Sequence, residues 1–182
     1  LQLAMINQKD ISLKMSKDIN EMEKMLNDYL QFAKAQIHEE TVAINIYDLF
    51  KEIIKETNNS NLHLKEEEEK IILVARQNAL KRCFNNLIQN GLSYGKNVFV
   101  SLTKSSNRLT ILIEDDGPGI PTDEYKNVFK PFYRLDKSRS LNNSGVGLGL
   151  SIAEDIVNSH GGTIKLSVSV YNGLSVKISL PF

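Results

Sequence analysis

The chain has 182 residues, which is enough for one well-buried domain and a smaller element. Its 22 basic and 22 acidic residues cancel, so the charge gives no support for binding to nucleic acid or to an anionic membrane surface. Hydrophobic residues make up 41% of the sequence, as in an ordinary globular protein, and no apolar run is long enough to span a bilayer. The one cysteine, Cys83, permits no internal disulfide and is expected to be a small buried hydrophobic residue.

Residues 1–40 are predicted to form a unit of their own, with a heptad pattern of apolar side chains at Met15, Ile19, Met22, Leu26, Tyr29 and Ala33. A single helix cannot bury such a stripe alone, so we expect it to pack in a bundle or a dimer. The alternative is a helix that lies on the core of its own domain. Residues 1–6 are also rich in apolar side chains, which indicates a helical-hairpin fragment of a dimeric bundle.

Residues 41–182 are predicted to form a second domain that begins with shorter elements. Residues 41–46 alternate like a strand, and residues 47–56 have helical spacing. Residues 61–64 and 70–74 resemble two strands joined by the acidic run Glu66–Glu69. That run is expected to be a solvated turn, since metal binding would need converging ligands.

The rest of this domain is predicted to contain two helices and two hairpins: a helix over 77–94, a hairpin of 98–102 with 109–113, a helix over 148–159 and a hairpin of 164–170 with 174–180. Gly161 and Gly162 supply the left-handed end of the second helix, and Asn172-Gly173 supplies the turn of the last hairpin. Because strands and helices do not alternate regularly, the predicted fold class is α+β.

Two glycine-rich segments indicate a nucleotide site. Residues 113–120 read Ile-Glu-Asp-Asp-Gly-Pro-Gly-Ile, in which an apolar strand runs into an acidic turn and places Asp115 at the mouth of a pocket. A carboxylate there can accept a hydrogen bond from an exocyclic amine, which adenine has and guanine lacks at the same ring position. Asp116 is interpreted as turn chemistry. Residues 145–150 open a helix and leave backbone N–H groups free to meet an anion, and the long polar segment between the two indicates a mobile cover.

Asn86 and Asn90 share one face of the predicted helix over 77–94. Amides are costly to bury unless they meet a ligand or the backbone. An amide oxygen is also an acceptable ligand for Mg²⁺, which is usually held by phosphates and waters as well. Taken alone, the pair would more often be structural than functional.

The order of these segments resembles the ATP-binding domain of sensor histidine kinases, in the superfamily shared with gyrase, Hsp90 and MutL. The matching segments are 86–90, 115–120, 129–132 (Phe-Lys-Pro-Phe) and 145–150, followed by the helix up to Gly162. The resemblance implies a two-layer α/β sandwich with a mixed sheet, the Bergerat or GHKL ATPase fold. The heptad helix resembles the second helix of the family's dimerisation and histidine-phosphotransfer domain, and residues 114–116 and 21–32 resemble the osmosensor branch.

The resemblance also implies roles for individual residues. Asn90 would hold the Mg²⁺ that bridges the ATP phosphates with support from Asn86, and Asp115 would receive the adenine amine. Phe129 and Phe132 would anchor a lid, with ordinary core packing as an equal alternative. The full implied ATP-binding set is Asn86, Asn90, Tyr94, Asp115, Gly117, Gly119, Ile120, Phe132, Arg134, Lys137, Arg139, Gly145, Gly147, Leu148 and Gly149.

The sequence departs from the family's pattern at two positions near the asparagines. Gly91 stands where many relatives carry alanine, at a cost of about 1 kcal/mol in helix stability. Ser93 stands where many carry a lysine or arginine that could meet a phosphate. Lys96 or an arginine of the lid could take over that charge.

The function implied is transfer of the ATP γ-phosphoryl group to a histidine of the dimerisation domain, and from there to an aspartate in the receiver domain of a response regulator. The family's acceptor histidine opens a His-Glu/Asp-x-x-x-Pro box, and none of the three histidines, His38, His63 and His160, stands in one. The chain is therefore expected to be a fragment that forms homodimers through its heptad helix. It should bind ATP with Mg²⁺ without phosphorylating itself. Its parent would sit in the cell membrane, with this part on the cytoplasmic face.

Three alternatives remain open. An anti-sigma-type serine kinase shares the same motifs but normally lacks a heptad helix before them. A gyrase-like or MutL-like ATPase would need a transducer domain and a catalytic acid for water. A nucleotide-sensing dimerisation module would bind ATP without chemistry.

Overall fold

The computed structural model describes residues 12, 15–16, 19, 22–23, 39–65, 70–135 and 147–182. The chain divides into two compact units, Leu1–His38 and Glu39–Phe182. The division lies two residues before the boundary expected from the sequence. The acidic run 66–69 lies outside the described residues.

The described residues of the first unit are helical at 12, 15–16, 19 and 22–23. Three of the heptad side chains, Met15, Ile19 and Met22, are 59%, 53% and 67% exposed. Leu26, Tyr29 and Ala33 lie outside the described residues. The bundle or dimer expected of this helix stays a prediction.

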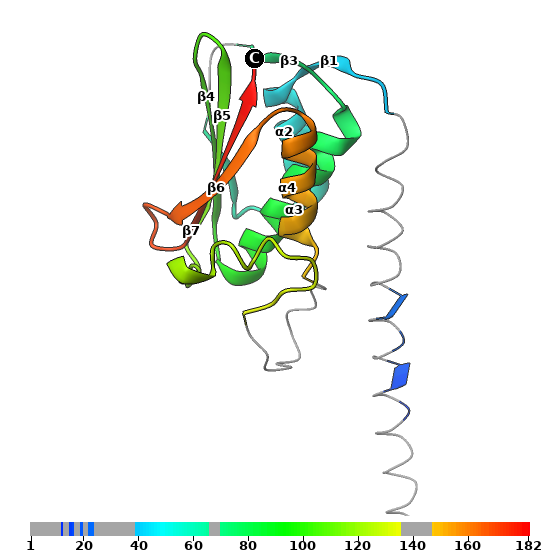
Figure 1. Ribbon diagram of the computed structural model, residues 1–182, viewed down its shortest axis with the longest axis vertical. Helices are drawn as coiled ribbons and strands as arrows, with labels where there is room; N and C mark the ends of the chain where they lie inside the picture. Colours follow the sequence, from blue (N-terminus) through cyan, green and yellow to red (C-terminus); the bar gives the residue numbers. More distant parts are fainter. Residues whose placement is uncertain are drawn as a thin grey trace, which may run out of the picture. The chain divides into compact units, whose positions relative to one another are not determined.

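The second unit is built on a five-stranded mixed sheet in the order β2-β4-β5-β7-β6 (Figure 1). Its strands are Leu62–Leu64 (β2), Val98–Lys104 (β4), Arg108–Asp115 (β5), Thr163–Val168 (β6) and Leu174–Pro181 (β7). β2 runs parallel to β4, and the other neighbours are antiparallel. A separate antiparallel pair is formed by Val42–Asn45 (β1) and Ile72–Ala75 (β3).

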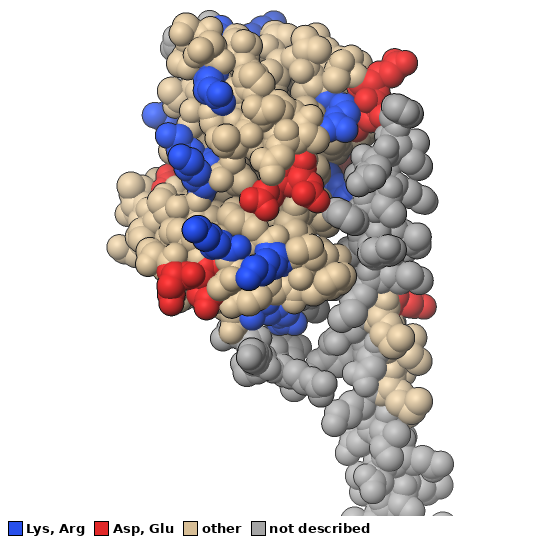
Figure 2. Space-filling model, viewed as in Figure 1, with Lys and Arg blue, Asp and Glu red and all other residues tan. Residues whose placement is uncertain are grey.

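Three helices cover one face of the five-stranded sheet (Figure 1): Ile46–Thr57 (α2), Gln77–Tyr94 (α3) and Gly149–Ser159 (α4). The strands alternate accordingly, with Leu109, Ile111 and Ile113 of β5 buried toward the helices. Basic and acidic side chains are interspersed over the face shown in Figure 2. The α+β class and the two-layer sandwich expected from the sequence are confirmed.

The core lies between the helices and the sheet. The rings of Phe50 on α2 and Phe84 on α3 stack there, with centroids 4.5 Å apart. Cys83 is fully buried beside them on α3, and burial raises the pKa of its thiol to about 12. The expectation of a small buried hydrophobic residue is confirmed, because a thiol held neutral in this way is unreactive.

The helix ends follow from local side chains. The Asn45 side chain accepts a hydrogen bond from the N–H of Tyr47 and so caps α2, which ends at Asn58 in the left-handed conformation. α3 covers the predicted range 77–94. Past the end of α4, Gly161 has the predicted positive φ of 69°.

The two strands on either side of the acidic run belong to different sheets. β2 pairs with β4, whereas β3 pairs with β1. Alternation of apolar residues predicts that a strand exists, but its partner depends on the packing of distant segments. Along the chain, α2 and β2 lie between β1 and β3. In space, β3 nevertheless pairs with β1.

His160 follows α4 and is half-buried against the start of α3. Its Nδ1 lies 2.7 Å from the carbonyl oxygen of Ile156, and its Nε2 accepts a hydrogen bond from the N–H of Arg76 at 3.3 Å. Burial lowers the pKa of His160, and the charge of Arg76 lowers it further, whereas the bond to Ile156 and the charge of Glu39 raise it. The lowered pKa favours the neutral imidazole, whose Nε2 can accept the hydrogen bond from Arg76.

Glu39 caps α3 from outside the helix. Its Oε1 accepts a hydrogen bond from the N–H of Asn78 at 2.6 Å and its Oε2 from the N–H of Ala79 at 3.1 Å. Arg76, which precedes the helix, provides no side-chain cap. Replacing Glu39 by alanine is therefore expected to lower the free energy of unfolding by about 1 kcal/mol in urea denaturation.

The exposed neighbour Glu40 provides a matched control. Glu40→Ala should change the free energy of unfolding by less than roughly 0.5 kcal/mol. Equal effects of the two substitutions would show that the cap contributes nothing.

Candidate ATP-binding site

Asp115 ends β5 on the helix-covered face of the sheet and is only 6% exposed. Its Oδ1 accepts two backbone hydrogen bonds, from the N–H of Gly117 at 2.9 Å and from the N–H of Leu174 at 3.1 Å. Burial raises the pKa of the Asp115 carboxyl; the two N–H bonds oppose this shift without cancelling it, and the charge of Asp116 adds to it. A buried carboxylate with one oxygen occupied is suited to recognise a donor at the other oxygen.

Asp116 joins the acidic turn to the loop after α3. Its Oδ1 accepts hydrogen bonds from the N–H groups of Lys96 and Asn97 at 2.7 and 2.8 Å, and its Oδ2 accepts one from the Asn97 side chain at 2.7 Å. The bonds from Asn97 are the main reason why the pKa of Asp116 is lowered. Asp116 thus acts as a turn residue. Its side chain binds the loop after α3, at Lys96 and Asn97, and not the acidic turn in which it lies.

Asn86 and Asn90 lie one turn apart on α3, and both are partly exposed. The Nδ2 atom of Asn86 is buried and has no hydrogen-bond partner in the described part of the chain. Rotation of the amide by 180° would place its oxygen at the same position instead. A Cβ on Gly149, the first residue of α4, would lie 3.9 Å from the Cβ of Asn86, so Asn86 and the glycine run meet.

Gly147 lies two residues before α4 and against Phe132. Its carbonyl oxygen accepts a hydrogen bond from the N–H of Phe132 at 2.9 Å. Its φ is +79°, and a Cβ there would lie 2.7 Å from the carbonyl oxygen of Tyr133. Only glycine fits both conditions. Leu148 behind it is buried and supplies no side-chain cap to α4, so within the described part of the chain the first N–H groups of the helix are left for a ligand to meet.

The segment before Phe132 is tied together by Glu124, which lies in the short 3-10 helix Thr122–Glu124 (η1). Its Oε2 accepts hydrogen bonds from Tyr133 Oη at 2.6 Å and from Asn127 Nδ2 at 2.8 Å. The bond from Tyr133 lowers the pKa of Glu124 and raises that of Tyr133. This cluster was not predicted from the sequence, because nothing in the local pattern marks it.

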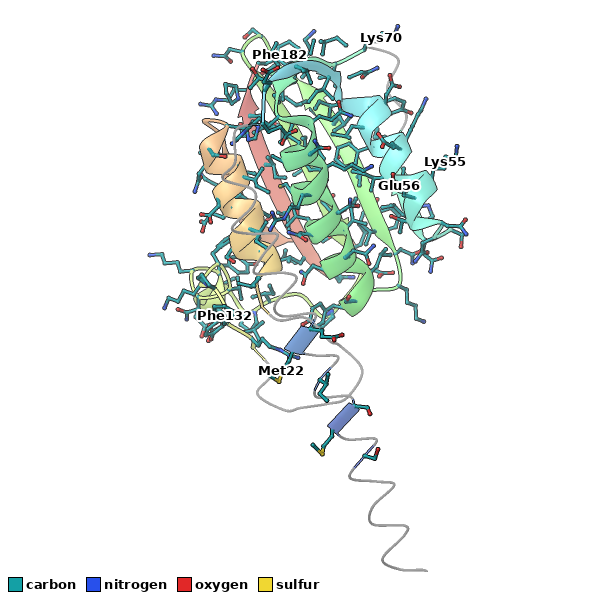
Figure 3. All side chains as sticks on the ribbon, turned by 90° about the vertical axis from the view of Figure 1, so that its right-hand side faces the viewer. Met22, Lys55, Glu56, Lys70, Phe132 and Phe182 are labelled. Atoms are coloured by element: carbon teal, nitrogen blue, oxygen red, sulfur yellow. The ribbon has the colours of Figure 1, made fainter. Side chains whose placement is uncertain are left out.

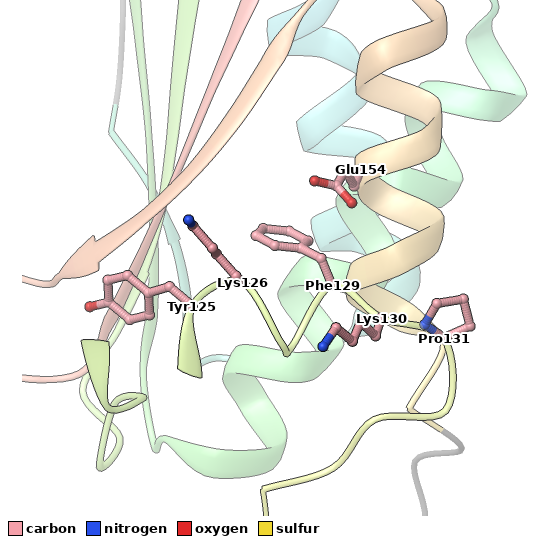
Figure 4. A pocket seen from close by; sticks show the side chains of 6 residues that line it. All are labelled: Tyr125, Lys126, Phe129, Lys130, Pro131 and Glu154. Atoms are coloured by element: carbon pink, nitrogen blue, oxygen red, sulfur yellow. The ribbon is translucent and has the colours of Figure 1, made fainter. Parts of the chain in front are cut away.

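Phe132 lies at the end of the domain opposite Phe182 (Figure 3). It is 62% exposed and has a φ of 64°, which costs a non-glycine residue roughly 1–3 kcal/mol. Its ring therefore does not pack into the core, whereas its N–H holds Gly147. Phe129 is partly buried and lines a pocket of about 460 Å³ together with Tyr125, Lys126, Lys130, Pro131 and Glu154 (Figure 4).

That pocket contains none of the residues of the predicted ATP-binding set. It lies between the segment after η1 and α4 (Figure 4). We place the candidate site at Asp115 and Asn86 instead, because these positions hold the buried carboxylate and the buried Nδ2 atom that has no partner among the described residues. In the described ranges, no three His, Cys, Asp or Glu side chains converge on a metal site.

The remaining predicted residues fall into two groups. Gly117 lies against the end of α3, where a Cβ would come 2.9 Å from the carbonyl oxygen of Tyr94. The Tyr94 side chain is 51% exposed, Gly119 and Ile120 are partly buried, and Arg134 is exposed. Lys137, Arg139 and Gly145 lie outside the described residues.

The structure gives a reason for one of the two departures noted in the sequence. A Cβ on Gly91 would lie 2.7 Å from Cγ2 of Val98 on β4, so α3 approaches the sheet more closely than a side chain here would allow. Ser93 donates its hydroxyl hydrogen bond to the carbonyl oxygen of Gln89.

Residues 75–182 match the family model described as histidine kinase-, DNA gyrase B- and HSP90-like ATPase. The chain belongs to this ATPase family. The sensor histidine kinase GtrS of Pseudomonas aeruginosa is 30% identical over 188 residues, which cover 100% of this chain and 38% of GtrS. The sensor protein RstB of Escherichia coli is 30% identical over 92% of this chain and 40% of RstB. The chain thus spans about two fifths of the length of these curated relatives.

A solved structure of a histidine kinase domain resembles this chain in both sequence and fold. The histidine kinase domain of the E. coli osmosensor EnvZ is 32% identical, with a TM-score of 0.59 over 80% of this chain and 90% of that domain. The chain therefore contains an ATP-binding catalytic domain of the sensor histidine kinase type, whose family model matches residues 75–182. None of the described helices is long and apolar enough to cross a membrane.

Proposed function

We propose that this chain binds ATP with Mg²⁺ and presents the γ-phosphoryl group to a histidine of a dimerisation domain, from which the receiver domain of a response regulator takes it onto an aspartate. One observation carries the proposal. The Oδ1 of buried Asp115 is occupied by two backbone N–H groups, while its Oδ2 has no hydrogen-bond donor among the described residues. The exocyclic amine of adenine is a donor suited to that oxygen.

The residues near Asp115 fit the rest of the nucleotide. Asn86, whose buried Nδ2 has no hydrogen-bond partner among the described residues, and Asn90 supply polar atoms one helical turn apart. Asn86 also lies next to the start of α4. We assign the Mg²⁺ to the side-chain oxygen of Asn90, with Asn86 in support. Bound there, Mg²⁺ would neutralise charge on the phosphates.

Transfer itself requires little covalent chemistry from the protein. The bond between the γ-phosphorus and the oxygen it shares with the β-phosphate breaks, a bond to the imidazole nitrogen forms, and ADP leaves. Asp115 would fix the base, and the backbone of residues 147–149 would hold the phosphates. The resemblance assigns four residues to the phosphate end of ATP: Arg134, Lys137, Arg139 and Gly145. It assigns four others to the base: Tyr94, Gly117, Gly119 and Ile120.

The heptad helix is proposed to form the homodimer. The exposed fractions of Met15, Ile19 and Met22 support this, because an apolar stripe of this kind is stabilised by a partner helix. We further propose that the parent protein is anchored in the cell membrane and that this part faces the cytoplasm. The relatives that are sensor histidine kinases favour this function over an anti-sigma-type serine kinase or a gyrase-like ATPase.

The alternative is a nucleotide-sensing module that binds ATP without transferring its phosphoryl group. An experiment must distinguish this alternative from the proposed kinase. With labelled ATP, the chain alone is expected to carry no acid-labile label on His38, His63 or His160, because none of them stands in the acceptor box. Addition of a dimerisation fragment that carries a His-Glu-x-x-x-Pro box should place the label on that fragment. ATP binding without label on the added fragment would contradict the kinase proposal.

A further inference from the structure

The turn between β6 and β7 lies against Asp115, a contact that no motif in the sequence indicated. The turn is closed by two backbone hydrogen bonds, from Asn172 N–H to the oxygen of Ser169 at 3.0 Å and from Ser169 N–H to the oxygen of Gly173 at 2.9 Å. Tyr171 stacks on Phe99 of β4 with ring centroids 3.8 Å apart, which fixes the turn against the sheet. The turn is therefore held against the sheet, next to Asp115.

Gly173 lies in contact with Asp115. A Cβ at position 173 would overlap the backbone oxygen, the carbonyl carbon and the Oδ1 of Asp115. No side chain, however small, fits there unless the turn moves away. Gly119 of the acidic turn meets the same residue, since a Cβ on Gly119 would lie 3.4 Å from the oxygen of Gly173.

This close approach places the Leu174 N–H on Asp115. Leu174 is buried at the start of β7, and its N–H donates to Oδ1 from 59 residues away in the sequence. The second donor, Gly117, lies only two residues from Asp115 and moves with it. The Leu174 N–H is thus the one long-range bond among the described residues that holds the rotation of this carboxyl group.

We propose that Gly173 and the Leu174 N–H are positioning groups for base recognition: they occupy Oδ1 and thereby aim Oδ2 at the exocyclic amine of adenine. This inference rests on the proposed role of Asp115 in ATP binding. Without the Leu174 N–H, the carboxyl group can rotate, so that neither oxygen is held toward the base. The selectivity for an amine at this ring position then falls, while contacts to the phosphates remain.

The test compares two nucleotides on the full chain by calorimetric titration: ATP and purine riboside triphosphate, which carries hydrogen in place of the amine. The unmodified chain should bind ATP at least roughly tenfold more tightly, as expected for a buried hydrogen bond to a charged group. Gly173→Ala should reduce this ratio to nearly one, by weakening ATP binding and not by strengthening the binding of the analogue. An unchanged ratio in a folded Gly173→Ala variant would overturn the inference.

Gly161→Ala is the matched control. It adds the same methyl group in another turn of the domain, at a φ of 69°, where the nearest atom beyond its neighbours is Pro181 Cγ at 3.6 Å. It should lower the melting temperature without changing the ratio of affinities. If Gly161→Ala also abolishes the ratio, selectivity depends on overall stability and the positioning role is wrong.

A second variant covers the case in which Gly173→Ala does not fold. Replacement of Leu174 by its α-hydroxy acid exchanges the N–H for an ester oxygen without adding atoms, and it should reduce the ratio in the same direction. If this variant and Gly173→Ala keep the full ratio while Asp115→Asn loses it, only the positioning role is wrong. If the unmodified chain shows no preference for ATP, the proposed role of Asp115 fails instead.

Discussion

Asp115→Asn is expected to weaken ATP binding by roughly 10- to 100-fold, which corresponds to one mispaired buried hydrogen bond. The variant can keep its fold, because the amide oxygen can still accept the hydrogen bonds from Gly117 and Leu174 at the Oδ1 position. Its NH₂ group then stands at the Oδ2 position and presents a donor to the donor of adenine. Calorimetric titration with ATP and Mg²⁺ measures the loss.

Asp116→Asn is the control for this prediction. Asp116 is held by Lys96 and Asn97, and it lies in the same turn. Its replacement should lower the melting temperature without a comparable loss of ATP affinity. Wild-type affinity in Asp115→Asn would exclude this carboxylate from base recognition.

The affinity for ATP should also depend on the protonation of Asp115. Burial raises the pKa of this carboxyl above its ordinary value, and only the ionised form offers an acceptor at both oxygens. Affinity should therefore fall as the pH is lowered through that raised pKa. The loss should set in at a pH above the ordinary carboxyl pKa of roughly 4. Asp115→Asn should lack this component of the pH dependence.

Asn90→Ala is expected to remove most of the gain in ATP affinity that Mg²⁺ provides. The expected loss of affinity is about 10- to 100-fold, which is the usual cost of replacing a group around a bound metal. The physical reason is the loss of the amide oxygen assigned to the metal. The helix itself should not suffer, because alanine has the highest helix propensity. The measurement is titration with ATP in the presence of Mg²⁺ and again in the presence of EDTA.

Gln89→Ala provides the comparison, since Gln89 is the exposed neighbour on the same helix. It should retain the full Mg²⁺ dependence. With EDTA, wild type and Asn90→Ala should bind ATP with similar affinity. A Mg²⁺ dependence equal to that of wild type in Asn90→Ala would move the metal to another ligand.

Much of the fold is predictable because its signals are local. The range 77–94 of α3 follows from apolar side chains at helical spacing, and the left-handed φ of Gly161 and Asn172 follows from the residue types that tolerate it. The order of the asparagine, acidic and glycine segments also indicates the family, which the match over residues 75–182 shows. The roles of single residues in that site stay predictions.

The partners of the strands and the surroundings of Asp115 could not be predicted in the same way. β2 pairs in parallel with β4 across an intervening helix, and β3 pairs with β1. Likewise, Asn172-Gly173 marks a turn in the sequence, but nothing there shows that Gly173 lies against Asp115 or that Leu174 donates to it. Apolar periodicity and backbone preference depend on a few neighbouring residues, so they can be recognised in the sequence itself. Close contacts between residues 115 and 173 exist only once the sheet has brought β5 and β7 together.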